Sequence, residues 1–155
     1  MSENSKSKLA PAALLALVAF VGTFEGLRTV AYSDPVGIPT ICFGYTHGVQ
    51  LGDVATKDQC DGLLQEELLR ANQIVNRCIR HPLTDGQRGA LVSLTYNAGA
   101  QAVCGSTLQT KFNQGDSRAG CEQIKRWVYA KGVKLPGLVR RREAEFKMCT
   151  GDQRG

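Results

Sequence analysis

The sequence is poor in metal-ligating side chains and lacks long regular patterns. It contains two histidines, His47 and His81, and no pair of its cysteines has CxxC spacing, so we predict no metal centre. No internal repeat, low-complexity stretch or linker is present, which excludes repeat architectures. A length of 155 residues then predicts a single domain that can bury a core without disulfides.

Acidic residues are outnumbered by basic ones. The chain has 19 Lys and Arg against 14 Asp and Glu, a formal net charge of +5. This balance favours a polyanionic partner, a class that includes nucleic acid, anionic lipid and acidic cell-wall polymer. The run Arg140–Arg142 resembles a nucleic-acid patch, but no aromatic or glycine pattern for base stacking accompanies it, so we predict no nucleic-acid partner.

The six cysteines are spread through the chain, at Cys42, Cys60, Cys78, Cys104, Cys121 and Cys149. An even number with this spread favours three disulfides in an oxidising compartment. Six buried thiols in a cytosolic protein are the alternative. A chain of this size does not need cross-links to fold, so disulfides would indicate export.

The N-terminal region combines a polar start with an uncharged run. Residues 1–8 are polar with two lysines, and residues 9–24 carry no charge. Sixteen helical residues span about 24 Å, less than the ~30 Å hydrocarbon core of a bilayer. A cleaved signal, a plain core helix and an uncleaved export segment that enters the membrane weakly are all open. We favour the last, because Leu14 to Val21 is apolar on every side.

The remaining chain predicts a small β region followed by helices. Asp34 to Gly37 has the residue preferences of a type I turn, and Thr40 to Phe43 is expected to form a strand. The predicted helices begin after Thr56, Thr84, Ser106, Asp116 and Pro136, and the last three end near Gly115, Tyr129 and Cys149. The first three of these starts have capping-box spacing, with glutamine three residues on. One helix, a small sheet and then several helices indicate the α+β class.

Two acidic residues and a hydroxyl follow the uncharged run. Glu25 ends it, Asp34 lies nine residues later, and Thr40 lies six beyond that. Hydrolysis of a glycosidic bond commonly uses one protonated and one ionised carboxyl group. We expect apolar surroundings to keep Glu25 protonated as the acid, and water access to keep Asp34 ionised as the base. The Thr40 hydroxyl would hold the attacking water. Spacing alone carries little weight, because most such pairs are solvated surface charges.

The residues around these three closely resemble the phage-type lysozymes, the endolysins of glycoside hydrolase family 24. The matching positions are Glu25-Gly26-Leu27-Arg28, Ala31-Tyr32-Ser33-Asp34, Gly37-Ile38-Pro39-Thr40-Ile41, Gly44, Thr46, Gln87, Ala90-Leu91-Val92-Ser93-Leu94, Asn97-Ala98-Gly99, Ser106-Thr107-Leu108, Asn113, Gly115-Asp116, Arg126-Trp127, Gly137-Leu138 and Arg141-Arg142. The resemblance covers about residues 24–150, in order and with few gaps.

The resemblance implies a mostly helical, two-lobed lysozyme fold. It implies a small β-hairpin lobe at about 28–55, a helical lobe at about 56–150, and a long inter-lobe helix at about 56–79. Residues 25–155 would then be the catalytic domain, and residues 1–24 an export or signal-anchor segment that doubles as part of the first helix. The implied substrate is peptidoglycan, cut with inversion at the β-1,4 bond between N-acetylmuramic acid and N-acetylglucosamine. Inversion predicts carboxyl groups roughly 6.5–9.5 Å apart.

Further site residues and the disulfide pairing follow from the family's layout. Tyr96 and Arg126 are implied substrate contacts, with a core tyrosine and a surface charge as the alternatives. The implied disulfides are Cys42–Cys60, Cys78–Cys104 and Cys121–Cys149, one of fifteen possible pairings. Cys42 stands where the family often has glycine. Trp127 is expected in the core, because its spacing from Ile124 places both on one apolar face.

We therefore predict a monomeric muramidase for host cell lysis, without a cofactor. Residues 9–24 would carry export to the host periplasm and hold the protein transiently at the inner membrane. Retention in the cytoplasm until holin-mediated release is the alternative route. Alternative functions are an inactive peptidoglycan-binding module, a chitin-cleaving enzyme, a lytic transglycosylase, and a carrier whose residues 9–24 disrupt membranes by themselves.

Overall fold

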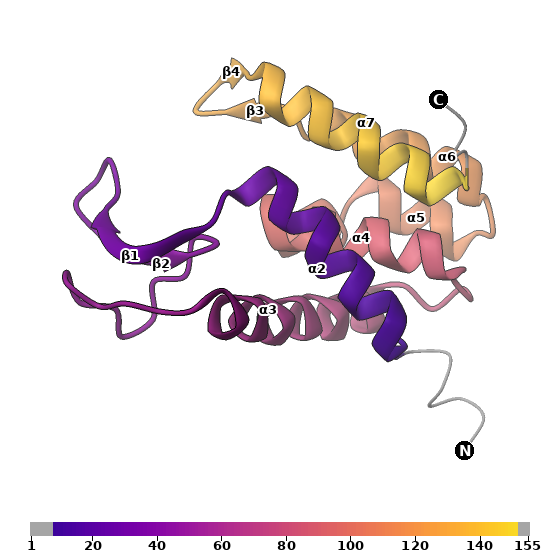
Figure 1. The fold of residues 1–155 in the computed structure, drawn as a ribbon. Helices are drawn as coiled ribbons and strands as arrows, with labels where there is room; N and C mark the ends of the chain where they lie inside the picture. Colours follow the sequence, from indigo (N-terminus) through magenta and orange to yellow (C-terminus); the bar gives the residue numbers. More distant parts are fainter. Residues whose placement is uncertain (1–7, 152–155) are drawn as a thin grey trace.

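The structure is a computed structural model that describes residues 8–151, and it contains six α-helices and two small antiparallel sheets in that range (Figure 1). The elements are α2 (Pro11–Glu25), β1 (Arg28–Ser33), β2 (Pro39–Cys42), α3 (Lys57–Cys78), α4 (Asp85–Ala98), η1 (Ala100–Ala102), α5 (Thr107–Asn113), α6 (Ser117–Gln123), η2 (Ile124–Arg126), β3 (Tyr129–Ala130), β4 (Val133–Lys134) and α7 (Pro136–Thr150). The α+β, mostly helical fold class is confirmed.

Helix α4 is the centre of the helical lobe. Every residue from 88 to 95 is buried, because α3 packs on one side of α4 and α7 on the other (Figure 1). The approach of α4 to α7 requires glycine at position 86, where a Cβ atom would lie 2.5 Å from the Met148 carbonyl oxygen. The single core therefore has α4 as its axis.

The β1–β2 hairpin forms the small lobe, and α3 leads from it into the helical lobe (Figure 1). The predicted turn is present: the Gly37 N–H donates to the Asp34 carbonyl over 2.9 Å, and Gly37 has a φ of +86°. Tyr32 pairs with Thr40 across the hairpin. Strand β2 begins at Pro39, one residue earlier than predicted, and α3 matches the predicted inter-lobe helix closely.

The sequence signals for helix starts are largely confirmed. Thr56 and Thr84 cap α3 and α4, each within a complete capping box. Ser106 also caps its helix and accepts from the Gln109 N–H, but the Gln109 side chain accepts from the Gly105 N–H instead of returning to Ser106. The third capping box is therefore only half formed.

The helix predicted from Asp116 to Tyr129 is too long by six residues. Helix α6 ends at Gln123, a short 3₁₀ turn follows, and the chain then forms the β3–β4 hairpin. One cause is a tertiary contact: the Trp127 carbonyl accepts from Arg142 Nε over 2.9 Å, outside any helical ladder. The hairpin reverses at Lys131 and Gly132, whose positive φ values of 51° and 78° no α-helix contains.

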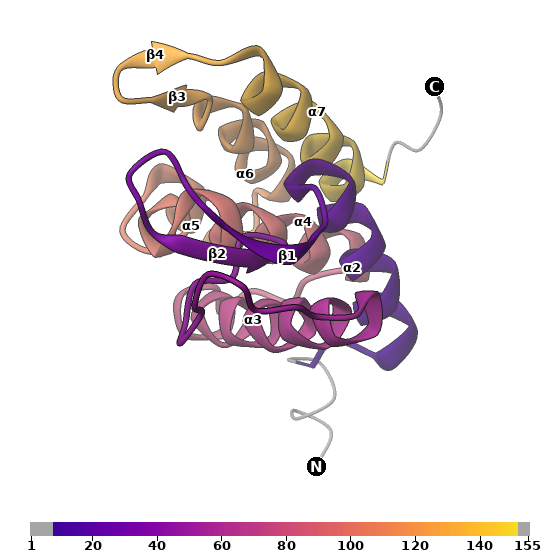
Figure 2. The same ribbon diagram turned by 60° about the vertical axis from the view of Figure 1, so that its left-hand side comes forward.

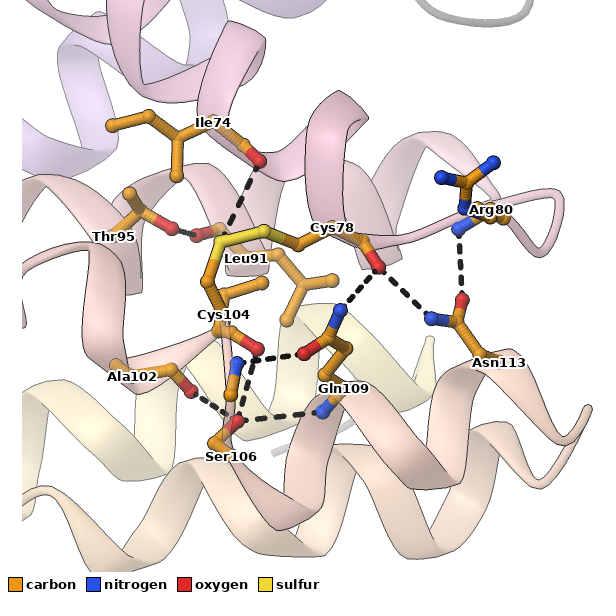
Figure 3. Close-up of a disulfide and its surroundings, with 12 residues drawn as sticks. Ile74, Cys78, Arg80, Leu91, Thr95, Ala102, Cys104, Ser106, Gln109 and Asn113 are labelled. Carbon is orange, nitrogen blue, oxygen red and sulfur yellow. Dashed lines mark hydrogen bonds between the residues drawn. A yellow bond between two sulfur atoms is a disulfide. The ribbon is translucent and has the colours of Figure 1, made fainter.

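All three predicted disulfides are present: Cys42–Cys60, Cys78–Cys104 and Cys121–Cys149. Their Cα atoms lie 4.9, 5.4 and 5.8 Å apart, within the range of unforced bridges. Figure 3 shows the second bridge, where the Gln109 and Asn113 side chains donate to the Cys78 carbonyl over 3.0 and 2.9 Å. The bridge and these bonds together hold the end of α3 against α5.

Helix α2 packs on the body through one face only. Leu17, Val18 and Val21 are buried, whereas Leu15 keeps 60% of its surface exposed. Residues 1–7 of the predicted export segment lie outside the described residues. Among the residues that the structure does describe, no helix has both the length and the apolar character needed to cross a bilayer.

Candidate active site

An open groove lies where the end of α2 meets the start of α7. Its lining comes from α2, α4 and the first turns of α7: Thr23, Phe24, Glu25, Asn97, Leu135, Pro136, Gly137, Leu138, Arg140 and Arg141. Of the three residues predicted to be catalytic, Glu25 lines this groove, while Asp34 and Thr40 belong to the β1–β2 lobe. The groove therefore contains one predicted carboxyl group, and the other lies in the β1–β2 lobe.

The carboxylate of Glu25 forms an ion pair with Arg141. Arg141 Nη1 lies 2.5 Å from Glu25 Oε1, with the arginine side chain 4% exposed and the glutamate side chain 21% exposed. The Phe24 ring lies against the same guanidinium, 5.4 Å from its Cζ to the ring centroid. The surroundings of Glu25 thus combine an aromatic ring with a buried cation, and differ from the wholly apolar setting expected from the sequence.

Behind this pair lies a second, fully buried acid. Glu145 Oε1 accepts from Arg142 Nη1 over 2.5 Å, and Glu145 Oε2 accepts from the Ser93 hydroxyl over 2.5 Å. Arg141 Nε lies 3.5 Å from the same Oε2. Burial raises the pKa of the Glu145 carboxyl, and both arginines and the serine oppose that shift. Arg141 therefore lies between two carboxylates, one in the groove and one in the core.

Arg142 connects this cluster to the groove wall and to the β3–β4 hairpin. Its Nη2 donates to the Asn97 side chain, which lines the groove, and its Nε donates to the Trp127 carbonyl. Burial lowers the pKa of the Arg142 guanidinium, and Glu145 opposes the shift. Neither Glu145 nor Ser93 was predicted as a site residue from the sequence. Arg141 and Arg142 stand four and three residues before Glu145, a spacing that places them together on one helix face and that could have revealed the cluster.

Asp34 is held by the turn that it begins. Its Oδ1 accepts from the backbone N–H of Val36 and of Ile38, over 2.9 and 2.8 Å. These two bonds fix the orientation of the carboxylate and leave Oδ2 without a hydrogen-bond partner among the described residues. Oδ2 can therefore accept a bond from a water molecule.

Thr40 is 4% exposed, and its hydroxyl donates to the Ile38 carbonyl over 2.9 Å. The donated proton leaves the oxygen lone pairs available to accept. Two residues on, Cys42 has a φ of +63°, in the left-handed region that favours glycine. This conformation explains why glycine suits the position, and the bridge to Cys60 holds a cysteine there.

The two predicted substrate contacts lie in different places. The Tyr96 hydroxyl donates to the Phe43 carbonyl over 3.0 Å, and the ring lines a pocket between the β lobe and α3. Burial raises the pKa of Tyr96 to about 12, with the Glu25 charge adding to the shift. Arg126 is exposed and donates to the Gln123 side chain over 3.0 Å, away from the groove lining. Trp127, which was expected in the core, is half-buried and packs against it.

Sequence comparison identifies the family to which these site residues belong. The family model "Phage lysozyme" matches residues 22–145. The SAR-endolysin of Enterobacteria phage P21 is 41% identical over 130 residues, which cover 83% of this chain and 79% of that protein. The SAR-endolysin of Pseudomonas phage phiKMV is 42% identical over 142 residues, or 89% of this chain and 88% of that one. The matched region begins just before Glu25 and ends at Glu145.

Structural comparison agrees. The active form of the P1 phage endolysin Lyz superposes with a TM-score of 0.81 at 25% identity, covering 94% of this chain and 97% of that one. The likeness thus extends over both lobes of the fold.

Proposed function

The chain belongs to the phage lysozyme family and is an endolysin with muramidase activity, and on that premise we propose how its residues act on peptidoglycan. Glu25 is the general acid, which protonates the glycosidic oxygen that leaves. Asp34 is the base, which takes a proton from water as that water attacks the sugar carbon from the opposite face. Thr40 holds the water through its oxygen lone pairs. The reaction inverts the sugar carbon and uses no cofactor.

One observation carries this assignment: Glu25 lines the groove and is oriented by a buried arginine. A general acid must point at the bond that it protonates, and the contact with Arg141 Nη1 restricts the rotamers of Glu25. Asp34 has the complementary property of a fixed carboxylate with one oxygen available to water. Tyr96 and Arg126 remain proposed contacts for the glycan outside the groove that contains Glu25.

The decisive experiment is digestion of purified peptidoglycan, with mass analysis of the ends formed. The parent is expected to release reducing N-acetylmuramic ends, and Glu25→Gln and Asp34→Asn are each expected to release none. Glu143→Gln is the matched control, because Glu143 lies on the exposed side of α7. Normal product from Glu25→Gln would overturn the assignment of the acid. Anhydro-muramic ends from the parent would identify a transglycosylase, since water is then not consumed.

We also propose that residues 9–24 carry the protein to the host periplasm and hold it transiently at the inner membrane. Two relatives are named SAR-endolysins, and α2 shows an apolar residue to solvent at Leu15. In the folded enzyme this position tolerates a charge, whereas a lysine in the middle of an inserted segment costs about 3 kcal/mol. The two states therefore respond differently to one substitution.

Leu15→Lys separates the membrane step from catalysis. In the non-lytic Glu25→Gln background, Leu15→Lys is expected to move the protein out of the membrane fraction, while Leu15→Ala keeps it there. Purified Leu15→Lys with Glu25 intact is expected to cleave peptidoglycan like the parent. Equal fractionation of the lysine and alanine variants would contradict the membrane proposal and leave the catalytic one untouched.

A further inference from the structure

The positive charge of this protein is concentrated in one segment. Residues 125–142 contain seven Lys and Arg and no Asp or Glu, whereas the rest of the chain has more acidic than basic residues. Arg141 and Arg142 are buried in the cluster described above. Lys131, Lys134 and Arg140 are exposed, so the cationic surface centres on the β3–β4 hairpin and the first turns of α7.

The hairpin itself contributes little to the core. Every residue from 129 to 137 is exposed, and within residues 8–151 the strands β3 and β4 pair only with each other. Tyr129 is 64% exposed and lies directly opposite Lys134 in the register. Since paired residues share a face of a hairpin, one face presents an aromatic ring beside an ammonium group. An exposed two-stranded hairpin is marginally stable alone. Here its base is held by the Leu135 N–H, which donates to the Val128 carbonyl over 3.0 Å.

The hairpin continues directly into the groove that contains Glu25. Strand β4 ends at Lys134, and the next residues, from Leu135 to Arg141, supply most of one groove wall. The hairpin and the β1–β2 lobe project from the same end of the molecule (Figure 1), and the view of Figure 2 shows one above the other. A polymer that lies along the groove therefore passes the hairpin as it leaves.

We propose that Lys131, Lys134, Arg140 and Tyr129 form a binding surface for the anionic peptides attached to the glycan strand. This inference depends on the proposed function, because it assumes that the groove holds the glycan. Peptidoglycan peptides carry free carboxylates, which exposed ammonium and guanidinium groups attract, and an exposed tyrosine packs against sugar or peptide. The surface thus selects glycan strands that still carry their peptides. An anionic lipid surface is the rival ligand, and continuity with the groove favours the peptide.

The test compares two substrates and two variants. The substrates are intact peptidoglycan and the same glycan strands stripped of peptides by an amidase. The test variant is Lys131→Gln/Lys134→Gln/Arg140→Gln. The matched control is Arg77→Gln/Arg80→Gln/Lys111→Gln, which removes the same number of charges from α3, from the segment after it and from α5; Figure 3 shows Arg80. Thermal unfolding of both triple variants establishes that they fold. If the test variant does not fold, the single substitution Lys134→Gln replaces it.

At low salt, the kcat/KM of the test variant on intact peptidoglycan is expected to be about tenfold below that of the parent, mostly because KM rises. On stripped strands the loss in kcat/KM is expected to be smaller than this by at least about fivefold. Added salt is expected to remove most of this difference, because exposed charges are screened. Equal losses on both substrates, or no loss on either, would overturn the proposal. A second result would also overturn the proposal: the parent and the control bind vesicles of anionic phospholipid, the test variant does not, and its hydrolysis of peptidoglycan is unchanged.

The proposal and the catalytic assignment fail separately. If Glu25→Gln still cleaves, the assignment of the acid is wrong, and co-sedimentation with insoluble peptidoglycan still measures the surface. In that assay the parent is expected to bind more tightly than the test variant, and the control to bind like the parent. Equal sedimentation of all three would overturn the surface by itself.

Discussion

Arg141 and Glu25, which are 116 residues apart in the sequence, form an ion pair that joins the last residue of α2 to α7. The pair crosses from the first helix that the structure describes to the last. The orientation of the proposed acid is therefore fixed by the opposite end of the chain.

Replacing Arg141 is the most direct test of that orientation. Arg141→Met removes the guanidinium that faces Glu25 and is expected to lower the rate of peptidoglycan hydrolysis by about a hundredfold, since small misplacements of reacting groups have effects of this size. Arg141→Lys keeps the charge but loses the planar fork, so an intermediate loss of about tenfold is expected. Hydrolysis rates measured beside thermal unfolding separate orientation from stability. Full activity in the methionine variant would show that the pair does not position Glu25.

The buried acid behind the pair predicts an effect on stability. Glu145→Gln leaves two buried arginines without their shared carboxylate and is expected to lower the free energy of unfolding by about 3 kcal/mol. Glu143→Gln, two residues away and exposed, is expected to change it by less than about 0.5 kcal/mol. Urea unfolding monitored by Trp127 fluorescence measures both. Similar midpoints for the two variants would show that the cluster contributes little.

Tyr96 predicts a dependence on alkaline pH. Its folded-state pKa of about 12 exceeds the ordinary value of 10.0, so its contribution to stability is present below pH 10 and is lost as the pH rises toward 12. Tyr96→Phe loses a hydrogen bond worth about 1 kcal/mol but does not titrate. The stability gap between the parent and this variant is therefore expected to shrink between pH 9 and 12. Tyr129→Phe, at an exposed ring, is the comparison, and an unchanged gap for Tyr96→Phe would contradict the assigned cause.

The disulfides predict a separation of stability from activity. Because they close segments of similar length, serine replacement of either Cys42 and Cys60 or Cys78 and Cys104 is expected to cost about 3 kcal/mol of unfolding free energy. The first pair holds β2, which carries Thr40, against α3, so its loss is expected to reduce activity more at a temperature where both variants are folded. Equal residual activities would show that the first bridge has no role in placing Thr40.

Local signals in the sequence predicted much of the fold. The caps at Thr56 and Thr84 and the turn at Gly37 are decided by neighbouring residues, and these predictions are confirmed. The β3–β4 hairpin was missed because the positive-φ turn at Lys131 and Gly132 was not recognised and because a long-range bond holds the chain just before it. The Trp127 carbonyl bonds to Arg142, which no local pattern indicates.

The candidate site, too, has a part that could be predicted from the sequence and a part that depends on packing. The resemblance identified Glu25, and the structure places it in a groove. Arg140, Arg141 and Arg142 are alike as residue types and differ only in their direction around α7, so the sequence does not indicate which of them contacts a carboxylate. Arg140 is exposed and the other two are buried, a difference that the packing of α7 against α4 determines.

The order of the cross-links has a consequence for biogenesis. The first cysteine is joined to the second, the third to the fourth and the fifth to the sixth, so the three bridged segments follow one another without nesting or overlap. If the polypeptide enters an oxidising space in the order from Cys42 to Cys149, each thiol meets its correct partner before the next pair of cysteines appears. Oxidation of each pair in turn would then give the native disulfides without disulfide exchange, and oxidative folding would keep pace with translocation.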